Sequence, residues 1–460
     1  MIAPPQLPTG WVSTTLDEVA RWGSGGTPSR SHPEFFGGSI PWIKTGELGP
    51  RTIADSEEHL TAEGLESSSA KLFPQGSVAV AMYGATIGKA SILGVAAATN
   101  QACAVGIPLC VSSQFLHYYL VSQAEALAAA GQGGAQPNIS QGVVRSWPIR
   151  LPPLREQDRI VDALDEALSG NDAAVAELLA AKRKLSRLRQ SLLKAAIEGT
   201  LTVDWRDQEE ISSSGSPGIP RDWRLLAINE IGTVQLGRQR SPDKVGGSNP
   251  TPYIRAANIT ERGVDLRDVL EMDFNASEIQ TFALSQGDVL LTEASGSAEH
   301  VGRPAIWPRV DGLFCFQNTV VRFRPKLVSS EFAYFLFMAQ QKLGVFASLS
   351  AGVGINHLSA GKFGRLRVLV PPLAEQKEIV ERLEAAFEAV EEQERTIEWS
   401  MARAAAQRQN ILRAAFSGQL VPQDSSDEPA SVLLERIRAQ RQAAVPSTKR
   451  KAGRPAKATA

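Results

Sequence analysis

The sequence predicts an α+β protein with an internal pseudo-twofold repeat. We expect two mainly β domains with flanking helices, separated by two long antiparallel coiled-coil helices. A Pro-Pro-Leu-x-Glu-Gln motif opens an uninterrupted helical pattern twice, within Leu151–Gln157 and within Val370–Gln376. In both copies the motif leucine lies 45 residues before the glycine that ends the pattern, and nine of the first eighteen aligned pairs are identical. A duplication of this kind means that the chain consists of two similar halves.

Each copy predicts one long helix. The proline pair suits a helix start, and the glycines Gly199 and Gly418 are typical stops. A helix of this length is a rod of about 65–70 Å. Apolar residues recur on a heptad, which gives each helix a stripe that needs a partner. The stripe residues are Val161, Leu164, Leu168, Val175, Leu178, Leu185 and Leu192 in the first copy, and Val380, Leu383, Phe387, Val390, Ile397, Met401 and Ile411 in the second.

Charge predicts that the two helices run antiparallel. Leu154–Glu177 holds seven acids and two bases, whereas Leu178–Gly199 holds six bases and one acid. In the second copy, Leu373–Thr396 holds eight acids and three bases, and Ile397–Gly418 holds three bases and one acid. Antiparallel packing places each acidic start beside a basic end. A simpler interpretation, in which the gradient only complements each helix's own dipole, stays open.

The segments outside the helices match in order. Ile40–Leu48 corresponds to Thr251–Ile259, and both are rich in β-branched and aromatic residues punctuated by Gly and Pro. Such segments indicate mainly β domains. Helical patches at Phe115–Ala130 and Glu331–Leu343 flank them. We expect a first domain at 1–150, a long helix at 151–201, a linker at 202–219, a second domain at 220–369, a second long helix at 370–420, and a short helix with a disordered basic tail at 421–460.

Composition indicates a folded protein of the cytoplasm. Apolar residues make up 43% and charged residues 21% of the chain, and the net charge is −1. The three cysteines, Cys103, Cys110 and Cys315, are odd in number and lack metal-ligand spacing, which favours a reducing compartment. The apolar run Val78–Ala98 contains Lys89 and several glycines, so it predicts two strands and a turn rather than a membrane span.

No motif predicts catalysis. Gly84–Ser91 resembles a phosphate loop, but it is one residue short between its glycines and lacks Ser or Thr directly after Lys89. Ser248–Tyr253 differs from the Asn-Pro-Pro-Tyr of amino-methyltransferases by an inserted threonine, and no glycine-rich cofactor loop precedes it. The five histidines are scattered. We expect no catalytic residue, metal or cofactor on this chain.

Polar residues at corresponding loop positions are the candidates for function. Lys44 corresponds to Arg255, Lys89 to Arg303, and Asn100-Gln101 to Gln317-Asn318. Amides can make paired hydrogen bonds to adenine, and arginine or lysine can do so to guanine. The ordinary alternative is that these side chains satisfy turn backbone or lie in solvent. The candidate DNA-binding residues are Lys44, Thr45, Glu47, Tyr83, Thr86, Lys89, Asn100, Gln101, Gln136, Asn138, Arg238, Arg240, Arg255, Asn258, Ser295, Ser297, Arg303, Gln317, Asn318 and Asn356.

The motifs together resemble the specificity subunit of type I restriction-modification systems. The motifs that carry this resemblance are Trp11, Gly25–Ser29, Ile40–Ile43, Thr86–Lys89, Thr99–Gln101 and the repeated helix opening. The resemblance covers Leu7 to Leu420. The second half departs from the pattern, since Ser297–Arg303 replaces Thr-Ile-Gly-Lys and Phe316–Asn318 replaces Thr-Asn-Gln.

The resemblance implies a non-catalytic DNA-recognition subunit with two target recognition domains, each reading one half of a split site. It implies that the paired helices fix the gap and dock methylation subunits. The expected partners are double-stranded DNA, two methylation subunits and two restriction subunits, without a membrane. S-adenosylmethionine, ATP and Mg are expected on those partners. Two other classes stay open: an adaptor whose β domains grip proteins, and an autonomous methyltransferase. The basic tail contains Gly453-Arg454-Pro455, the centre of a minor-groove-binding motif, although a solvated tail explains it more simply.

Overall fold

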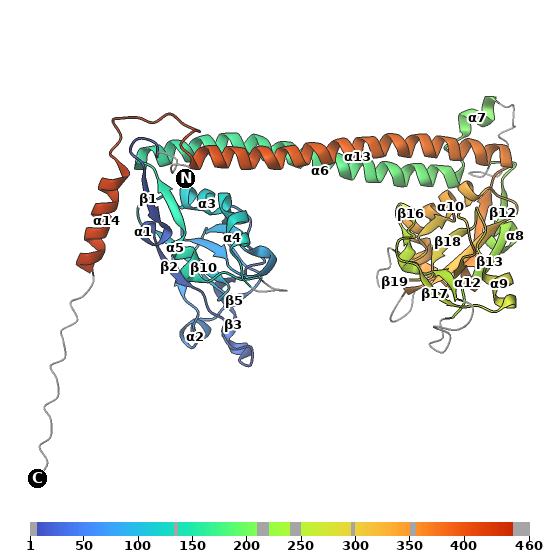
Figure 1. The fold of residues 1–460 in the computed structure, drawn as a ribbon, viewed down its shortest axis with the longest axis horizontal. Coiled ribbons are helices and arrows are strands. Elements are labelled where there is room, and N and C mark those ends of the chain that lie inside the picture. Colours follow the sequence, from blue (N-terminus) through green and yellow to red (C-terminus); the bar gives the residue numbers. More distant parts are fainter. Residues whose placement is uncertain are drawn as a thin grey trace, which may run out of the picture. The chain divides into compact units, whose positions relative to one another are not determined.

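The computed structural model describes residues 7–132, 137–208, 220–239, 250–295, 300–349 and 356–444. The chain divides into two compact units, Met1–Glu177 with Ser400–Ala460, and Leu178–Trp399. We call them unit 1 and unit 2. Each unit contains one β domain and a part of both long helices (Figure 1).

The two long helices form where the sequence predicts them. Helix α6 spans Leu154–Glu198 and helix α13 spans Leu373–Phe416. Gly199 follows α6 with φ of 78°, and Gly418 follows the last turn of α13 with φ of 76°. Glycine takes this left-handed conformation without steric cost, so it ends each helix.

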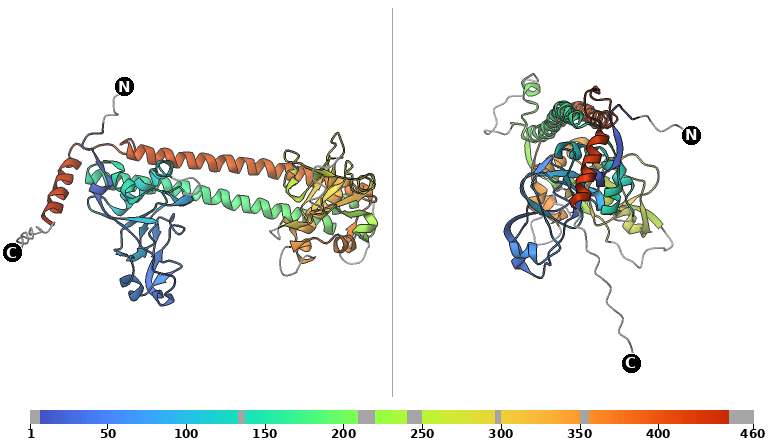
Figure 2. Two further views of the ribbon diagram at one scale, coloured as in Figure 1. Left: turned by 60° about the horizontal axis from the view of Figure 1, so that its bottom comes forward. Right: turned by 90° about the vertical axis from the view of Figure 1, so that its left-hand side faces the viewer.

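Within each unit the two helices lie side by side and antiparallel (Figure 2). In unit 1, Asp172 of α6 pairs with Arg408 of α13 at 2.5 Å. In unit 2, Lys182 pairs with Glu398 at 3.1 Å, and Arg189 pairs with Glu391 at 3.7 Å. Within unit 2, the residue later in α6 (Arg189) therefore pairs with the residue earlier in α13 (Glu391). The predicted antiparallel arrangement is therefore confirmed.

Unit 1 carries eleven described strands in three sheets. Their orders are β2-β10-β7-β8-β4, β5-β3-β9-β6 and β1-β11. The strands are β1 (Val12–Thr15), β2 (Ala20–Ser24), β3 (Phe36–Ile43), β4 (Thr52–Ile53), β5 (His59–Leu60), β6 (Leu72–Phe73), β7 (Val78–Ala81), β8 (Ala90–Leu93), β9 (Ala97–Thr99), β10 (Cys103–Pro108) and β11 (Pro148–Leu151). Its shorter helices are α1 (Leu16–Val19), α2 (Ala62–Glu66), α3 (Ser113–Ser122), α4 (Ala124–Ala129), α5 (Gln141–Ser146) and α14 (Ala430–Ala444).

Unit 2 shares part of this topology, and its described strands form two further two-stranded sheets. Its sheets have the orders β13-β22-β18-β20, β17-β14-β21, β12-β24, β15-β16 and β19-β23. The strands are β12 (Arg224–Ala227), β13 (Gly232–Leu236), β14 (Pro250–Ile254), β15 (Ile259–Thr260), β16 (Gly263–Val264), β17 (Leu270–Asp273), β18 (Val289–Thr292), β19 (Ala294–Ser295), β20 (Pro304–Ile306), β21 (Cys315–Phe316), β22 (Val320–Pro325), β23 (Asn356–His357) and β24 (Arg367–Val370). Its shorter helices are α7 (Val203–Gln208), α8 (Ile228–Ile231), α9 (Ala276–Phe282), α10 (Ser330–Lys342), α11 (Val345–Leu349) and α12 (Ala360–Arg365).

The long helices belong to the cores of both domains. In unit 1, Leu164 of α6 and Leu412 of α13 lie in one apolar cluster with Phe115 of α3. In unit 2, Leu193 of α6 and Leu383 of α13 lie in one cluster with the α10 phenylalanines. Burial of such side chains contributes about 1.5–3 kcal/mol each, so each domain is anchored on a two-helix platform.

A buried tryptophan–carboxylate contact joins each domain to the helix that follows it. Trp11 donates its indole N–H to Glu156 at 3.0 Å, and Trp223 donates to Glu375 at 2.8 Å. Both carboxylates are the Glu of the repeated helix-opening motif. The segment after the other long helix completes each contact within the same unit: Gln423 donates to Glu156 at 3.2 Å, and the Arg206 guanidinium pairs with Glu375. We call these two contacts the junctions.

One predicted boundary needs correction. The expected linker 202–219 begins with helix α7, in which Arg206 is buried against Glu375, so residues 203–208 are folded. The rest of that linker lies outside the described residues. The short helix expected within 421–460 is α14, which spans Ala430–Ala444 and packs beside α1 through the Arg438–Glu18 pair. Asp427 precedes this helix, and its buried carboxylate pairs with Arg159 at 2.7 Å.

Other local predictions agree with the structure. The run Val78–Ala98 forms strands β7 and β8 around a turn, and the predicted helical patches are α3 with α4, and α10. Among the described helices, none is both long and apolar enough to cross a membrane. The basic tail lies outside the described residues.

Candidate functional site

Two parallel strand pairs bring the predicted loop residues together. In unit 1, β3 runs parallel to β9, and the backbone N–H of Asn100 donates to Ile43 O at 3.0 Å. In unit 2, β14 runs parallel to β21, and the backbone N–H of Gln317 donates to Ile254 O at 2.9 Å. Lys44 therefore begins the loop beside Asn100, as Arg255 begins the loop beside Gln317. The predicted correspondence between these residues is confirmed.

A glycine turn approaches each of these loops closely. Gly25 follows β2, and a Cβ built on it would lie 2.1 Å from Thr99 O. Gly237 follows β13, and its Cβ would lie 2.1 Å from Gln317 O. A residue with a Cβ does not fit at this distance, so glycine is required at both positions. In unit 1 the turn also brings Thr27 within hydrogen-bonding distance of the Gln101 amide oxygen.

The loop after the central strand closes the same way in both domains. In unit 1, Ala81 N donates to Lys89 O at 2.9 Å, and in unit 2 Thr292 N donates to Arg303 O at 3.1 Å. Lys89 and Arg303 are therefore structural equivalents, as predicted. A further backbone bridge joins Tyr83 to Asn138, and strand β19 pairs Ser295 with Asn356.

Each domain thus gathers polar loops from separated parts of the chain at one end of its parallel strand pair. We call each of these groups a loop cluster. The first comprises residues 25–27, 44–47, 83–89, 100–101 and 138, and the second comprises residues 237–238, 255–258, 293–295, 300–303, 317–318 and 356–357. The predicted residues Gln136, Arg240 and Ser297 lie outside the described residues.

Side chains of the first loop cluster divide into exposed and structural ones. Tyr83 is 46% exposed, and Lys89 and Gln101 are exposed as well. Glu47 holds its own loop, since its carboxylate accepts from the backbone N–H groups of Lys44 at 3.0 Å and Glu57 at 3.2 Å. Other members make local contacts: Thr86 donates to Tyr83 O at 2.8 Å, Asn100 Oδ1 accepts from Cys103, and Thr45 is half-buried.

A cation network lies beside this cluster. Lys44 Nζ is 3.0 Å from Glu58 Oε1, and Arg30 Nη1 is 2.6 Å from Glu58 Oε2. The Arg30 guanidinium also stacks over the rings of Phe36 and Trp42. Hydrogen bonds from Arg30 and Lys44 lower the pKa of Glu58 to about 2. No sequence motif includes Arg30 or Glu58, because only the fold brings them to Lys44.

Two predicted residues of the second cluster have structural roles. Asn258 is 3% exposed; its Oδ1 accepts from Arg255 N, and its Nδ2 donates to Asp265 O and Asp268 O at 2.9 Å. Arg238 is 7% exposed and donates to Glu278 at 2.8 Å. Both side chains stabilise their own loops, and their contact with DNA stays a prediction.

The remaining members of the second cluster are more accessible. Arg255 is half-buried and pairs with the exposed Asp268. Gln317 and Asn318 are half-buried, and Asn318 N donates to Arg238 O at 2.9 Å. His357, beside Asn356, lies 3.2 Å from Glu293 Oε2. No sequence motif includes His357, because only the fold brings it to Glu293.

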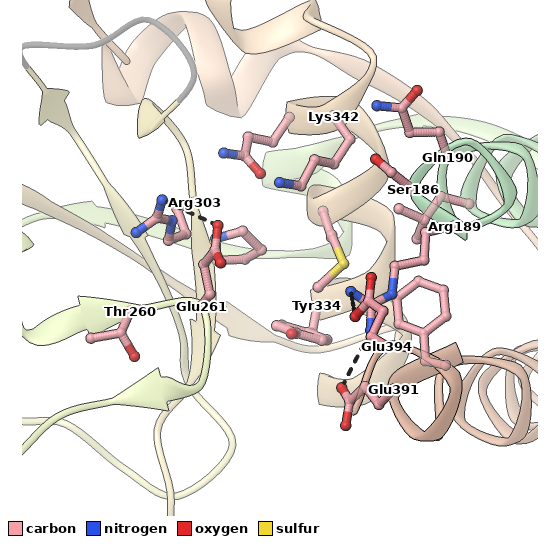
Figure 3. A pocket seen from close by; sticks show the side chains of 15 residues that line it. Ser186, Arg189, Gln190, Thr260, Glu261, Arg303, Tyr334, Lys342, Glu391 and Glu394 are labelled. Atoms are coloured by element: carbon pink, nitrogen blue, oxygen red, sulfur yellow. Dashed lines mark ion pairs between the residues drawn. The ribbon is translucent and has the colours of Figure 1, made fainter. Parts of the chain in front are cut away.

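Arg303 differs from its equivalent Lys89. It lines a cavity of about 280 Å³ between α10, the two long helices and the β15–β20 region (Figure 3). Arg303 lies 3.7 Å from Glu261 on one side of the cavity, and Arg189 contacts Glu391 and Glu394 on the other (Figure 3). For Lys89, by contrast, no ion pair is seen within the described part of the chain.

Comparison with known proteins agrees with this duplicated architecture. The family model for the type I restriction modification DNA specificity domain matches residues 8–178 and 220–398. The EcoKI specificity subunit of Escherichia coli K12 is 25% identical, and the match covers 95% of this chain and 97% of that subunit. The StySPI specificity subunit of Salmonella potsdam is 23% identical, with coverage of 95% and 96%.

A solved structure shares the fold. A chain from a study of complex assembly and conformational transition of the type I restriction-modification system aligns with a TM-score of 0.61 at 20% identity. The alignment covers 90% of this chain and 100% of that one. The two family matches fall on the two halves that carry the loop clusters. The chain therefore belongs to the type I restriction-modification DNA specificity family, and it is a DNA sequence-recognition subunit with two recognition domains rather than a catalytic subunit.

Proposed function

We propose that each loop cluster reads one half of a split DNA target. The observation that carries this proposal is the duplication of the cluster: the same backbone framework presents different polar side chains in the two domains. Lys44, Asn100 and Gln101 occupy in the first domain the places that Arg255, Gln317 and Asn318 occupy in the second. Amide and cationic side chains are those that read base edges in the major groove. A shared framework with different side chains suits two unlike half-sites.

In the first domain the exposed members Tyr83, Lys89 and Gln101, together with Lys44, are the proposed DNA contacts. In the second domain Arg255, Gln317, Asn318 and Arg303 take this role, along with Ser295 and Asn356 from the paired strands β19 and β23. Asn258, Arg238 and Glu47 support these contacts by fixing the loops. Lys89 and Arg303 are suited to backbone phosphate, which fixes register without carrying sequence information.

We further propose that the paired helices fix the gap between half-sites and dock two methylation subunits through their outer polar faces. A continuous helix of 45 residues, α6, is about 68 Å long and has no internal proline, which gives it the stiffness of a spacer. S-adenosylmethionine, ATP and Mg would be held by the methylation partners and by two restriction subunits, in the cytoplasm.

A domain exchange tests the proposal. Residues 8–150 are replaced by the corresponding segment of another family member, and modified adenines are mapped across a genome that expresses the assembled complex. We expect one half of the target to change while the other half and the gap stay the same. A change in both halves, or in neither, would refute the assignment of one half-site to each domain.

Point substitutions then test the first loop cluster. Lys44→Ala and Gln101→Ala should relax the methylated sequence at positions of the first half-site only. Glu63→Ala, an exposed acid on α2 outside the cluster, serves as the control and should leave the pattern unchanged. An unaltered pattern in both Lys44→Ala and Gln101→Ala would show that these loops do not read the DNA.

A further inference from the structure

In the free protein, the first cation of each loop cluster is held by a carboxylate. Lys44 Nζ lies 3.0 Å from Glu58 Oε1 and 3.4 Å from Glu57 Oε2. Glu58 also binds the Arg30 guanidinium through both of its oxygens, at 2.6 and 3.0 Å. A single carboxylate thus neutralises two cations beside the proposed reading loop.

The second domain repeats this arrangement with different residues. Arg255, the equivalent of Lys44, pairs through Nη2 with Asp268. In each domain the acid follows the cation at a similar distance along the chain, 14 residues later in the first case and 13 in the second. The two domains have diverged in sequence, yet both retain a carboxylate on the same cation.

These carboxylates do not hold the loop backbone. Within the described residues, the hydrogen bonds seen for the Glu58 carboxylate come from Arg30 and Lys44, and the bond seen for the Asp268 carboxylate comes from Arg255. Loop support comes instead from Glu47 in the first domain and from Asn258 in the second. These ion pairs are partly exposed, and partly exposed pairs contribute about 0–1 kcal/mol to stability.

A carboxylate and a DNA phosphate compete for the same guanidinium or ammonium group, because both are anions that accept charge-assisted hydrogen bonds. Binding to DNA of any sequence depends mainly on phosphate contacts, whereas the correct sequence adds base-edge contacts. An internal competitor therefore weakens binding to unrelated DNA, and the correct half-site overcomes it through the additional contacts.

We propose that Glu58 and Asp268 are specificity-determining residues that compete with DNA for Lys44 with Arg30, and for Arg255. This inference rests on the proposed function of the loop clusters. It assigns to the two acids a role in rejecting unrelated DNA and gives Arg30 a DNA-binding role. Each domain carries its own competitor, so discrimination at the two half-sites is set separately.

The test uses the full chain assembled with its methylation partners. Glu58→Gln and Asp268→Asn keep the shape of each side chain and remove its charge. Binding of a labelled duplex carrying the mapped target, and of a scrambled duplex, is measured by fluorescence anisotropy between 50 and 200 mM salt. We expect affinity for the scrambled duplex to rise by about threefold or more in each variant, with a smaller rise for the target. The plot of log affinity against log salt should steepen by about 0.9 for each cation released.

Matched controls separate this effect from net charge. Glu63→Gln on α2 and Glu271→Gln on β17 remove the same charge from exposed acids for which no ion pair is seen within the described residues. An equal rise in affinity for the scrambled duplex in these controls would overturn the inference. Unchanged binding in both Glu58→Gln and Asp268→Asn would overturn it as well. A selective loss of target affinity would overturn it too, since it would mean that the acids read bases or orient the cations. If the wild-type complex does not distinguish target from scrambled duplex, the proposed function itself fails.

Discussion

The indole N–H of Trp11 donates a hydrogen bond to Glu156 Oε1 at 3.0 Å, although the two residues lie 145 positions apart. The contact joins the first residues of a recognition domain to the opening of the long helix that follows it. Trp223 and Glu375 repeat the contact in the second half at 2.8 Å. Since both glutamates are nearly inaccessible, the partners of their carboxylates bear directly on stability.

The two junctions should respond differently to loss of the carboxylate charge. Glu375 faces the buried guanidinium of Arg206, so Glu375→Gln leaves a buried cation without its counter-ion. Such a loss typically costs about 3 kcal/mol. Glu156 accepts from Trp11 and Gln423, which are neutral, so Glu156→Gln should change the free energy of unfolding by less than about 1 kcal/mol. Denaturant titration of both variants measures the difference, and equal losses would contradict this interpretation.

The Glu156 junction should also have a characteristic pH dependence. Burial raises the pKa of Glu156 above its usual value of 4.5, and it outweighs the hydrogen bonds from Gln423 and Trp11. The folded protein therefore binds this proton more tightly than the unfolded chain does. The contribution of this group to stability is full below pH 4.5 and is lost as the pH rises through the raised pKa. Thermal unfolding is measured for wild type and Glu156→Gln from pH 7 to pH 5. The melting temperature of wild type should rise relative to that of the variant as the pH falls. A relative loss would contradict the raised pKa.

Gly25→Ala should damage recognition at one half-site. The added Cβ would lie 2.1 Å from Thr99 O and 2.3 Å from Asn100 O, so the turn must move away from the loop that carries Asn100 and Gln101. We expect methylation at the target to fall at least tenfold. Gly361→Ala on α12 is the matched control, because it lies outside both loop clusters and its Cβ would meet nothing nearer than 3.9 Å. If the Gly361 variant is impaired as severely as the Gly25 variant, the close approach is not the cause.

The antiparallel helix pair can be tested by a double-mutant cycle. Asp172 and Arg408 form an ion pair at the surface of unit 1, so Asp172→Ala, Arg408→Ala and the double variant should give a coupling energy of about 0.2–1 kcal/mol. Raising the salt concentration should reduce it. Asp172 and Lys182 have different ion-pair partners. The effects of Asp172→Ala and Lys182→Ala on the free energy of unfolding should therefore be additive. Zero coupling between Asp172 and Arg408 would argue against the register seen here.

The loop clusters were only partly predictable. The sequence indicates that Lys44 and Arg255 are equivalent, because each follows a strand with the same neighbours in both halves. It gives no sign that Asn258 is buried with its amide fully engaged, or that Arg238 contacts Glu278. An Asn or Arg in a polar loop has the same local pattern whether it points into solvent or into the domain. Burial is decided by the segments that fold over the loop.

The sequence by itself determined the duplication, the bounds of the two long helices to within a few residues, and their antiparallel sense. These properties depend on short-range periodicity, on proline and glycine at helix ends, and on charge summed along a helix. Only the tertiary structure decided which carboxylate meets which cation. Glu58 with Arg30, Glu375 with Arg206 and Asp427 with Arg159 are partners separated by many residues. Such contacts depend on how distant segments close on one another, which the local pattern around any of these residues does not encode.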